Sequence, residues 1–490
     1  MINGEIRLRF APSPTGPFHI GGARSALFNW LLARKYNGTL IVRFEDTDRE
    51  RSTVESEENI KDSLLWLGLS WDEGIDVGGK NGPYRQIERL DIYKEYTDKL
   101  VEAGHAYYCY CTEEELEEDR KHSFEEGSNP IYSGRCRDLS SEDKEKFAQE
   151  GRKPTVRFHV PPEGQVLFKD LIRGAISFEK SGIGDFVIVK SDGIPVYNYA
   201  VVLDDALMKV THVIRAEEHL SNTPRQIVLY EALGFKQPEF GHVSLILGKD
   251  KTKMSKRQGA TSVTEYRNLG YLPEAIINFL ALLGWSTERE DEIFSVEELI
   301  QEFSLERVSK SPAVFDVDKL NFINSQYIKK SSSERIAEII KPHLVKSGFI
   351  KDANSVEENE YLIQVASEIK DYLSFGAQAP EHADIFYVDE IQFENEEAAE
   401  TLKSEDAKNL IETFKDRLNE LEEVNPENIK ALIKNLGKDL QVKGKQLFMP
   451  LRVAITGKMH GPELINIVPL IGRERTVRRV SLALKMAGHN

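Results

Sequence analysis

The chain has 490 residues, of which 40% are hydrophobic and 30% charged, and its formal net charge is −17 at pH 7. This composition excludes a disordered chain, and the length allows about two to four domains. The net negative charge taken alone argues against a nucleic-acid partner, but a local basic surface is what binding requires. The apolar runs are far shorter than the roughly 20 residues of a membrane span, and residues 1–9 lack a signal-peptide core, so we expect a cytoplasmic protein without a membrane partner.

The first 70 residues alternate between strand and helix patterns. Residues 6–10 (IRLRF) and 39–44 (TLIVRF) predict strands, and residues 22–36 between them carry an apolar stripe at helical spacing. Ser52 and Glu55 predict a capping box for the helix that follows. Because a strand–helix–strand unit of this size forms a right-handed parallel crossover, the pattern predicts a Rossmann-like, doubly wound α/β sheet.

The alternation stops after about residue 78 and resumes near residue 186. The stretch between them holds all three cysteines and an acidic helix pattern, whereas apolar strand candidates return at residues 186–189, 200–203 and 210–214. We therefore expect an insertion between two halves of one parallel sheet. From about residue 327 onward the sequence shows mainly helical periodicity, which predicts a separate all-α region.

The segment at residues 12–22 (PSPTGPFHIGG) joins the first strand to the first helix. A helix N-terminus presents unpaired N–H groups and a partial positive charge, so it favours an anion. Gly21 and Gly22 carry no side chain where a base or phosphate must approach the backbone, and His19 can donate to a phosphate. The full segment therefore indicates a nucleotide-binding loop.

A second candidate lies at residues 253–257 (KMSKR), close to Lys249 and Lys251. Positive charges crowded into one loop repel each other unless an anion lies among them. A triphosphate whose departing pyrophosphate gains negative charge is a natural occupant. The alternative is a solvated basic loop, but the presence of both segments in this order favours nucleotide binding.

The two segments resemble the HIGH and KMSKS signatures of class I aminoacyl-tRNA synthetases. The blocks RFEDTDRERS (43–52), DGIPVYNYAVVLDD (192–205) and VIRAEEHLSNTPRQ (213–226) narrow the resemblance to bacterial-type glutamyl-tRNA synthetases. The block GKQLFMPLRVAITGKMHGPEL (444–464) is similar to the end of the same family, so the resemblance spans nearly the whole chain. Gly22 replaces the last histidine of the general signature, a form that is common in the glutamyl branch.

The resemblance implies a fold in five parts. They are the first half of a Rossmann-like catalytic domain (1–78), an inserted acceptor-end-binding subdomain (79–190), the second catalytic half (191–244), a stem-contact region with KMSKR (245–326) and an α-helical anticodon-binding region (327–490). A member of this family ligates L-glutamate to tRNA(Glu) through a glutamyl-adenylate, uses ATP with Mg²⁺, and releases AMP and diphosphate. The implied partners are tRNA(Glu), L-glutamate and ATP, and we expect a monomer.

The family's site residues can be transferred to matching positions of this sequence. The implied ATP-binding residues are Pro12, Ser13, Thr15, Gly16, His19, Gly21, Gly22, Lys253, Met254, Ser255, Lys256 and Arg257. Among them, His19, Lys253 and Lys256 are the expected catalytic groups, which stabilise charge on the phosphates. The implied glutamate-binding residues are Arg9, Ser13, Glu45, Tyr197 and Arg215.

Two of the pocket residues have specific expected partners. Arg215 would pair with the side-chain carboxylate of glutamate, since a planar guanidinium binds a carboxylate at two points, and Glu45 would face the substrate ammonium. The alternatives are a salt bridge from Arg215 to Glu217 or Glu218, and an ordinary strand-end carboxylate at Glu45. Val201, where some relatives carry asparagine, is excluded from the pocket.

The three cysteines match a zinc-binding pattern of some family members. Zn²⁺ prefers four tetrahedral ligands, and Cys109, Cys111 and Cys136 supply three. We expect Asp138 as the fourth ligand, with Tyr132 as the alternative. Three reduced thiols without metal are the other interpretation.

Three other classes of protein compete with this interpretation. A glutamine-specific synthetase would have a β-barrel C-terminal half, and a truncated relative that modifies a tRNA base would lack that half altogether. A non-catalytic tRNA-binding descendant would not need both nucleotide signatures. The arginines Arg473, Arg475, Arg478 and Arg479 are candidates for tRNA backbone contact or for an ordinary surface helix. Whether tRNA(Gln) is also charged is left open.

Overall fold

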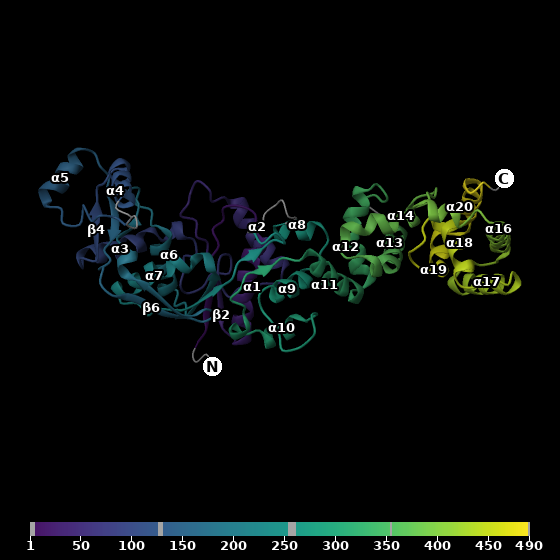
Figure 1. The fold of residues 1–490 in the computed structure, drawn as a ribbon, viewed down its shortest axis with the longest axis horizontal. Helices are drawn as coiled ribbons and strands as arrows, with labels where there is room; N and C mark the ends of the chain where they lie inside the picture. The colour runs from purple at the N-terminus through teal and green to yellow at the C-terminus, as the bar shows by residue number, and fades with distance from the viewer. Residues whose placement is uncertain (1–4, 126–130, 253–260, 353–354, 489–490) are drawn as a thin grey trace. The chain divides into compact units, whose positions relative to one another are not determined.

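The computed structural model describes residues 5–125, 131–252, 261–352 and 355–488. Two compact units emerge from the contacts, unit 1 with residues 1–266 and 276–317 and unit 2 with residues 267–275 and 318–490. The predicted fold class is confirmed, because an α/β region with a parallel sheet is followed by an all-helical region (Figure 1). Within the described ranges, no helix combines the length and hydropathy that crossing a membrane would require.

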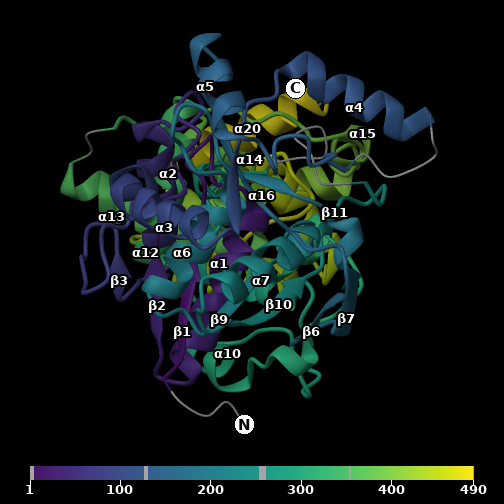
Figure 2. The ribbon, with the colours of Figure 1, turned by 90° about the vertical axis from the view of Figure 1, so that its left-hand side faces the viewer.

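The centre of unit 1 is a five-stranded sheet whose paired strands are all parallel. Its order is β3–β2–β1–β9–β10, as can be followed across Figure 2. The bounds are β1 (Arg7–Phe10), β2 (Thr39–Val42), β3 (Glu73–Gly74), β9 (His212–Ala216) and β10 (Glu239–Val243). The chain winds outward from β1 to β3 and then returns to the other side of β1, so the order reverses between β1 and β9. Open α/β sheets bind ligands at the carboxyl ends of the strands at such a reversal.

The helices of the catalytic sheet are α1 (Ile20–Lys35), α2 (Val54–Trp66), α6 (Tyr197–Leu207) and α7 (Thr223–Ala232). Helix α1 is buried along most of its length because it packs against the sheet and also against α10 (Val296–Glu302). The centroid of the Phe28 ring, for example, lies 5.0 Å from that of Phe303, the residue that directly follows α10. This double burial explains why α1 is apolar around much of its circumference.

The insertion between β3 and β9 forms its own small sheets. It contains α3 (Leu90–Glu102), β4 (Ala106–Cys109), α4 (Glu113–Glu125), α5 (Ser141–Gln149), β5 (Thr155–Phe158), β6 (Gln165–Asp170), β7 (Gly174–Glu179) and β8 (Phe186–Val189). Strands β4, β5 and β8 pair antiparallel, and β6 pairs with β7 as a hairpin. Further along the chain lie β11 (Ile246–Leu247), α8 (Val263–Asn268), α9 (Pro273–Leu282) and β12 (Ala313–Val314).

Three local predictions were wrong. Residues 200–203 lie in α6 rather than in a strand, because a short apolar run fits a fully buried helix as well as a strand. The strand at residues 186–189 exists, but it belongs to the antiparallel sheet of the insertion. The cap of α2 is Thr53, which accepts from the Ser56 N–H, and not Ser52.

Unit 2 is built from amphipathic helices, drawn in green to yellow in Figure 1. They are α11 (Val317–Lys330), α12 (Ser333–Lys346), α13 (Val356–Ile369), α14 (Ala379–Tyr387), α15 (Glu396–Glu400), α16 (Glu405–Glu420), α17 (Pro426–Asp439), α18 (Lys445–Thr456), α19 (Leu464–Ile471) and α20 (Arg473–Met486). Helix α16 buries Ala407, Leu410, Ile411, Phe414 and Leu418, which share one face at helical spacing. That face packs against α17, α18 and α20.

Candidate active site

A cleft of about 940 Å³ opens at the carboxyl ends of β1 and β9, where the strand order reverses. Every predicted ATP- or glutamate-site residue that the structure describes lines this cleft. These residues are Arg9, Pro12, Ser13, Thr15, Gly16, His19, Gly21, Gly22, Glu45, Tyr197 and Arg215. The predicted residues Lys253, Met254, Ser255, Lys256 and Arg257 lie outside the described residues.

The loop between β1 and α1 forms one wall of the cleft. His19 is the N-terminal cap of α1, and its Nδ1 accepts from the Gly22 N–H at 3.2 Å. The Ile20 N–H donates to the Thr261 carbonyl at 2.9 Å, which ties the loop to the segment that follows residues 253–260. These contacts hold the start of α1 at the wall of the cleft, and they already use the N–H groups of Ile20 and Gly22, so the Gly21 N–H between them is the group left to meet an anion.

The structure explains the glycine at position 22 by a contact other than the expected approach of a base or phosphate. A Cβ at this position would lie 2.8 Å from the Phe18 ring, so glycine leaves room for a buried aromatic side chain of the protein itself. At Gly16, by contrast, a Cβ would meet nothing within 4 Å. Of these two glycines, only Gly22 is thus required by packing within the protein.

The second wall carries buried charged side chains. Arg9 comes from β1, Glu45 follows β2, Tyr197 begins α6 and Arg215 comes from β9. Arg9, Glu45 and Arg215 are each less than 9% exposed, and Tyr197 is half-buried. The Glu45 N–H donates to the Pro12 carbonyl at 3.0 Å, so this wall and the loop at residues 12–22 are joined through the backbone.

The guanidinium of Arg215 contacts only neutral groups. Its Nε donates to His242 Nε2 at 3.1 Å, its Nη2 to Thr223 Oγ1 at 2.9 Å and its Nη1 to Tyr197 Oη at 3.4 Å. Among the described residues no carboxylate forms an ion pair with it, so the expected alternative of a salt bridge to Glu217 or Glu218 is not seen. Burial lowers the pKa of Arg215. A buried cation without a protein anion favours an anionic ligand.

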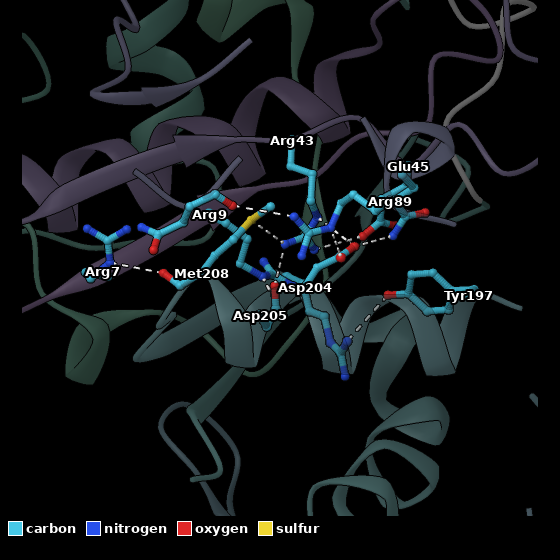
Figure 3. Close-up of polar contacts among 12 residues, drawn as sticks. Arg7, Arg9, Arg43, Glu45, Arg89, Tyr197, Asp204, Asp205 and Met208 are labelled. Carbon is cyan, nitrogen blue, oxygen red and sulfur yellow. Dashed lines mark hydrogen bonds and ion pairs between the residues drawn. The ribbon is translucent and has the colours of Figure 1, made fainter. Parts of the chain in front are cut away.

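Beneath the cleft lies a network of buried ion pairs that the sequence did not reveal (Figure 3). Asp205 accepts from Arg9 Nε at 3.2 Å and from Arg43 Nη1 at 2.9 Å, and Arg43 Nη2 lies 3.3 Å from Glu45 Oε1. Asp204 pairs with Arg89 at 2.6 Å. Because these side chains constrain one another, the two pocket residues Arg9 and Glu45 are held in fixed positions.

A signal for this network was present in the sequence. Arg43 directly follows an apolar strand, and Asp204 and Asp205 lie in the last turn of an apolar helix, so three charged residues occupy positions where burial is expected. Charged residues are seldom fully buried unless they are paired. Their mutual pairing could have been proposed from that rule, but the identity of each partner could not.

Burial also changes the titration of Glu45. Its burial raises the pKa to about 7, although Arg43 and Arg9 both oppose this rise. Glu45 is therefore partly protonated near neutral pH when the cleft holds no cation. A substrate ammonium at this point would stabilise the carboxylate and lower its pKa.

The three cysteines lie together in the insertion. Their sulfur atoms all lie within 4.8 Å of one another, with 3.5 Å between Cys111 and Cys136. Tyr132 Oη lies 3.4 Å from both Cys109 Sγ and Cys111 Sγ. Asp138 is exposed and is not a member of the cluster, so the arrangement favours Tyr132 over Asp138 as a fourth donor. Three thiols this close together suit Zn²⁺, which prefers cysteine sulfur in structural sites.

Three of the four candidate arginines of α20 have structural roles. Arg479 is 1% exposed and donates to the Ile455 and Val388 carbonyls, and Arg475 donates to the Phe386 carbonyl at 2.7 Å. Arg473 donates to the Leu421 carbonyl. Arg478 alone among the four has a largely exposed side chain, although it lies 3.7 Å from an acidic neighbour.

Unit 2 has a basic cavity of about 810 Å³ between α17, α18 and α19. Its basic lining residues are Lys430, Lys434, Lys438, Lys443 and Arg452. Phe448 also lines the cavity and is 49% exposed. An exposed aromatic ring among cations suits a stacked nucleic-acid base with nearby phosphates.

Comparison with known proteins gives consistent matches along the chain. A model described as tRNA synthetases class I (E and Q), catalytic domain, matches residues 5–322, and one described as Anticodon binding domain matches residues 335–484. The chain is 58% identical to a glutamate–tRNA ligase from Carboxydothermus hydrogenoformans, over 97% of this chain and 99% of the relative. It is 50% identical to a glutamate–tRNA ligase from Bacillus subtilis, over 98% and 99%. A crystal structure of a glutamate tRNA ligase from Elizabethkingia meningosepticum in complex with its amino acid superposes with a TM-score of 0.88 at 35% identity, covering 98% of this chain and 99% of that one.

Proposed function

The chain belongs to the class I tRNA synthetases for glutamate and glutamine, in the glutamate branch, and we propose that its cleft carries out both steps of tRNA glutamylation. The observation that supports this best is the buried guanidinium of Arg215, which has no carboxylate partner among the described residues and lies in the same cleft as the loop at residues 12–22. A glutamate side chain supplies the missing anion. A glutamine side chain does not, so the pocket favours the acid.

In the first step, the α-carboxylate of glutamate attacks the α-phosphate of ATP, and diphosphate leaves. Arg215 holds the substrate side chain and Glu45 holds its ammonium, so the α-carboxylate is directed toward the nucleotide at the start of α1. His19 and the partial positive charge at the start of that helix stabilise charge on the phosphates. Lys253 and Lys256 are assigned the same task by the family resemblance alone. Mg²⁺, bound with ATP, neutralises phosphate charge.

In the second step, a hydroxyl of the terminal ribose of the tRNA attacks the adenylate carbonyl, and AMP leaves. The insertion at residues 79–190 is proposed to hold the acceptor end and residues 327–490 to read the anticodon, with the boundaries remaining predictions. The all-helical fold of the described part of unit 2 is unlike the β-barrel expected for a glutamine-specific enzyme. We further propose a monomer that works in the cytoplasm.

The glutamate pocket is tested by exchange of labelled pyrophosphate into ATP, measured with glutamate or glutamine and with or without tRNA. Arg215→Ala should lower kcat/KM for glutamate by about 100-fold or more, because the substrate carboxylate loses its buried partner. Arg34→Ala is a matched control, because Arg34 pairs with Asp72 at 2.8 Å and does not line the cleft. Normal glutamate use by the Arg215 variant, or exchange with glutamine by the unmodified protein, would contradict the assignment.

The basic cavity of unit 2 is proposed to receive an anticodon base on Phe448. Phe448→Ala should raise KM for tRNA about 10-fold or more, since base stacking on an aromatic ring contributes roughly 1–3 kcal/mol. KM for glutamate should not change. Charging assays with separated tRNA(Glu) and tRNA(Gln) would also show whether the enzyme discriminates between them. An unchanged KM for tRNA in Phe448→Ala would exclude the stacking role of Phe448.

We propose that Cys109, Cys111, Cys136 and Tyr132 hold a structural Zn²⁺. The three thiols fit its donor preference, the Tyr132 hydroxyl lies beside two of them, and ligation would tie β4 to the segment around Cys136. Metal analysis of the purified protein should give about one zinc per chain. Cys109→Ser and Tyr132→Phe should lower the zinc content or affinity, and Asp138→Ala should not. Loss of zinc in the Asp138 variant alone would restore the first expectation.

A further inference from the structure

His242 lies directly beside Arg215 in the sheet. The two residues are register partners on β10 and β9, and both are buried, with exposures of 0% and 6%. His242 Nε2 accepts from Arg215 Nε at 3.1 Å, so in this arrangement Nε2 carries a lone pair and no proton. His242 is not among the residues that line the cleft. Any effect on the substrate must therefore pass through Arg215.

Asp170 determines which nitrogen of His242 carries the proton. The Asp170 Oδ2 lies 2.6 Å from His242 Nδ1, and a carboxylate can only accept, so the proton is on Nδ1. Asp170 Oδ1 accepts from the Ile172 and Arg173 N–H groups at 2.9 and 2.8 Å, which fixes the orientation of the carboxylate. Burial alone would raise the pKa of Asp170, but the hydrogen bonds from His242 and these backbone groups lower it.

We propose that Asp170 and His242 are positioning residues that hold Arg215 in the orientation needed to bind the substrate side chain. This inference rests on the proposed role of Arg215 in glutamate recognition. The guanidinium has five N–H donors, and its bonds to His242, Thr223 and Tyr197 use three of them, one from each nitrogen. Among the described residues this leaves one donor on each terminal nitrogen. One N–H group from each terminal nitrogen is what a guanidinium needs to bind a carboxylate at two points.

The residues around His242 explain why it must stay neutral. Arg215 and Arg173 are the cations beside it, Asp170 is the anion, and Thr223 Oγ1 lies 3.1 Å from Nε2. Burial, followed by the charge of Arg215, lowers the pKa of His242 although Asp170 opposes the shift. A proton on Nε2 would place two donors against each other and displace the guanidinium.

Asp170→Asn tests the proposal with minimal change of shape. Asparagine still accepts from the backbone N–H groups, but its NH₂ group donates to Nδ1 and moves the imidazole proton to Nε2, which then faces Arg215 Nε. We expect KM for glutamate to rise about 10- to 100-fold, the cost of a lost hydrogen bond to a charged group. KM for ATP should stay within about twofold, because the substitution does not touch the nucleotide loop.

Asp185→Asn is the matched control. Asp185 is a buried carboxylate that also accepts from a histidine, His159 at 3.1 Å, but it contacts neither Arg215 nor the cleft. Its KM for glutamate should equal that of the unmodified protein. In ¹⁵N spectra of labelled histidine, His242 should show the Nδ1–H tautomer in the unmodified protein and the Nε2–H tautomer in Asp170→Asn.

Measuring Arg215→Ala in parallel separates the positioning role of Asp170 and His242 from the proposed glutamate pocket itself. If Arg215→Ala loses glutamate use while Asp170→Asn keeps a normal KM for glutamate, the pocket stands and the positioning role is wrong. If neither variant changes glutamate use, the proposed pocket itself is wrong. An equal loss toward glutamate and ATP in Asp170→Asn would show a general structural defect and overturn the proposal. In the double variant, Asp170→Asn should add little to Arg215→Ala.

Discussion

The titration of Glu45 leads to a quantitative expectation for the pH dependence of glutamate use. Its carboxyl is 7% exposed, and burial raises its pKa to about 7 in the protein without substrate. Only the ionised carboxylate can pair with the substrate ammonium. Because kcat/KM reports the ionisation of the free enzyme, kcat/KM for glutamate should rise with pH until Glu45 is ionised.

The magnitude follows from the size of the shift. A rise from the ordinary value of 4.5 to about 7 corresponds to roughly 3 kcal/mol in favour of the neutral acid, at about 1.4 kcal/mol per pH unit. About one tenth of Glu45 is then ionised one pH unit below its pKa, so kcat/KM for glutamate at pH 6 should be about one tenth of its plateau value. The kcat should fall less, because the bound ammonium stabilises the carboxylate.

The assay is tRNA glutamylation at limiting and at saturating glutamate over about pH 5.5 to 8.5. His219 does not confuse the result, since burial and the charge of Arg215 lower its pKa to about 4, and Glu45→Gln separates the titration of Glu45 from any contribution of His19, which also lines the cleft. Glu45→Gln should reduce kcat/KM for glutamate and remove the dependence near pH 7. A profile that is flat, or one that persists unchanged in Glu45→Gln, would refute the reasoning.

Two further substitutions test stability. Asp205→Asn leaves two buried arginines without their shared carboxylate and should lower the free energy of unfolding of unit 1 by about 3–5 kcal/mol. Tryptophan fluorescence in denaturant measures this loss, since all four tryptophans lie in unit 1. A loss under about 1 kcal/mol would argue against the role of the buried ion pairs. Gly457→Ala places a Cβ 2.2 Å from the Gln392 carbonyl oxygen at a φ of +76°, so it should destabilise unit 2 by more than about 1 kcal/mol in thermal unfolding followed by circular dichroism. Gly348→Ala, with φ at +78° and no atom within 4 Å, should cost less, and equal losses would contradict the steric argument.

The predictions that rested on hydrophobic patterns over many residues are confirmed. The alternation over residues 6–68 correctly predicted a parallel α/β sheet, and the helical periodicity after residue 327 correctly predicted an all-α region. These patterns report how each residue is buried relative to its neighbours along the chain, and that is a local property. Short apolar runs gave the error at residues 200–203, since a buried helix and a buried strand look alike over four residues.

The candidate site also combines features that could be predicted from the sequence with contacts that only the structure showed. The family resemblance implied a cation at position 215 and a carboxylate at position 45 near the loop at residues 12–22, and the structure brings all three to one cleft. It gave no indication that Asp170, in the insertion, lies against His242, or that Asp205 lies against Arg9, because these partners are 72 and 196 positions apart. That the Tyr132 hydroxyl, and not the Asp138 carboxylate, lies beside the cysteines was also visible only in the folded chain.

The sequence alone thus determined which chemical groups are present and which local segments carry them. Only the tertiary structure decided which groups face one another, because a hydrogen bond or an ion pair depends on atoms meeting within about 3 Å in a water-poor interior. Spacing along the chain does not encode that distance when the partners come from different strands.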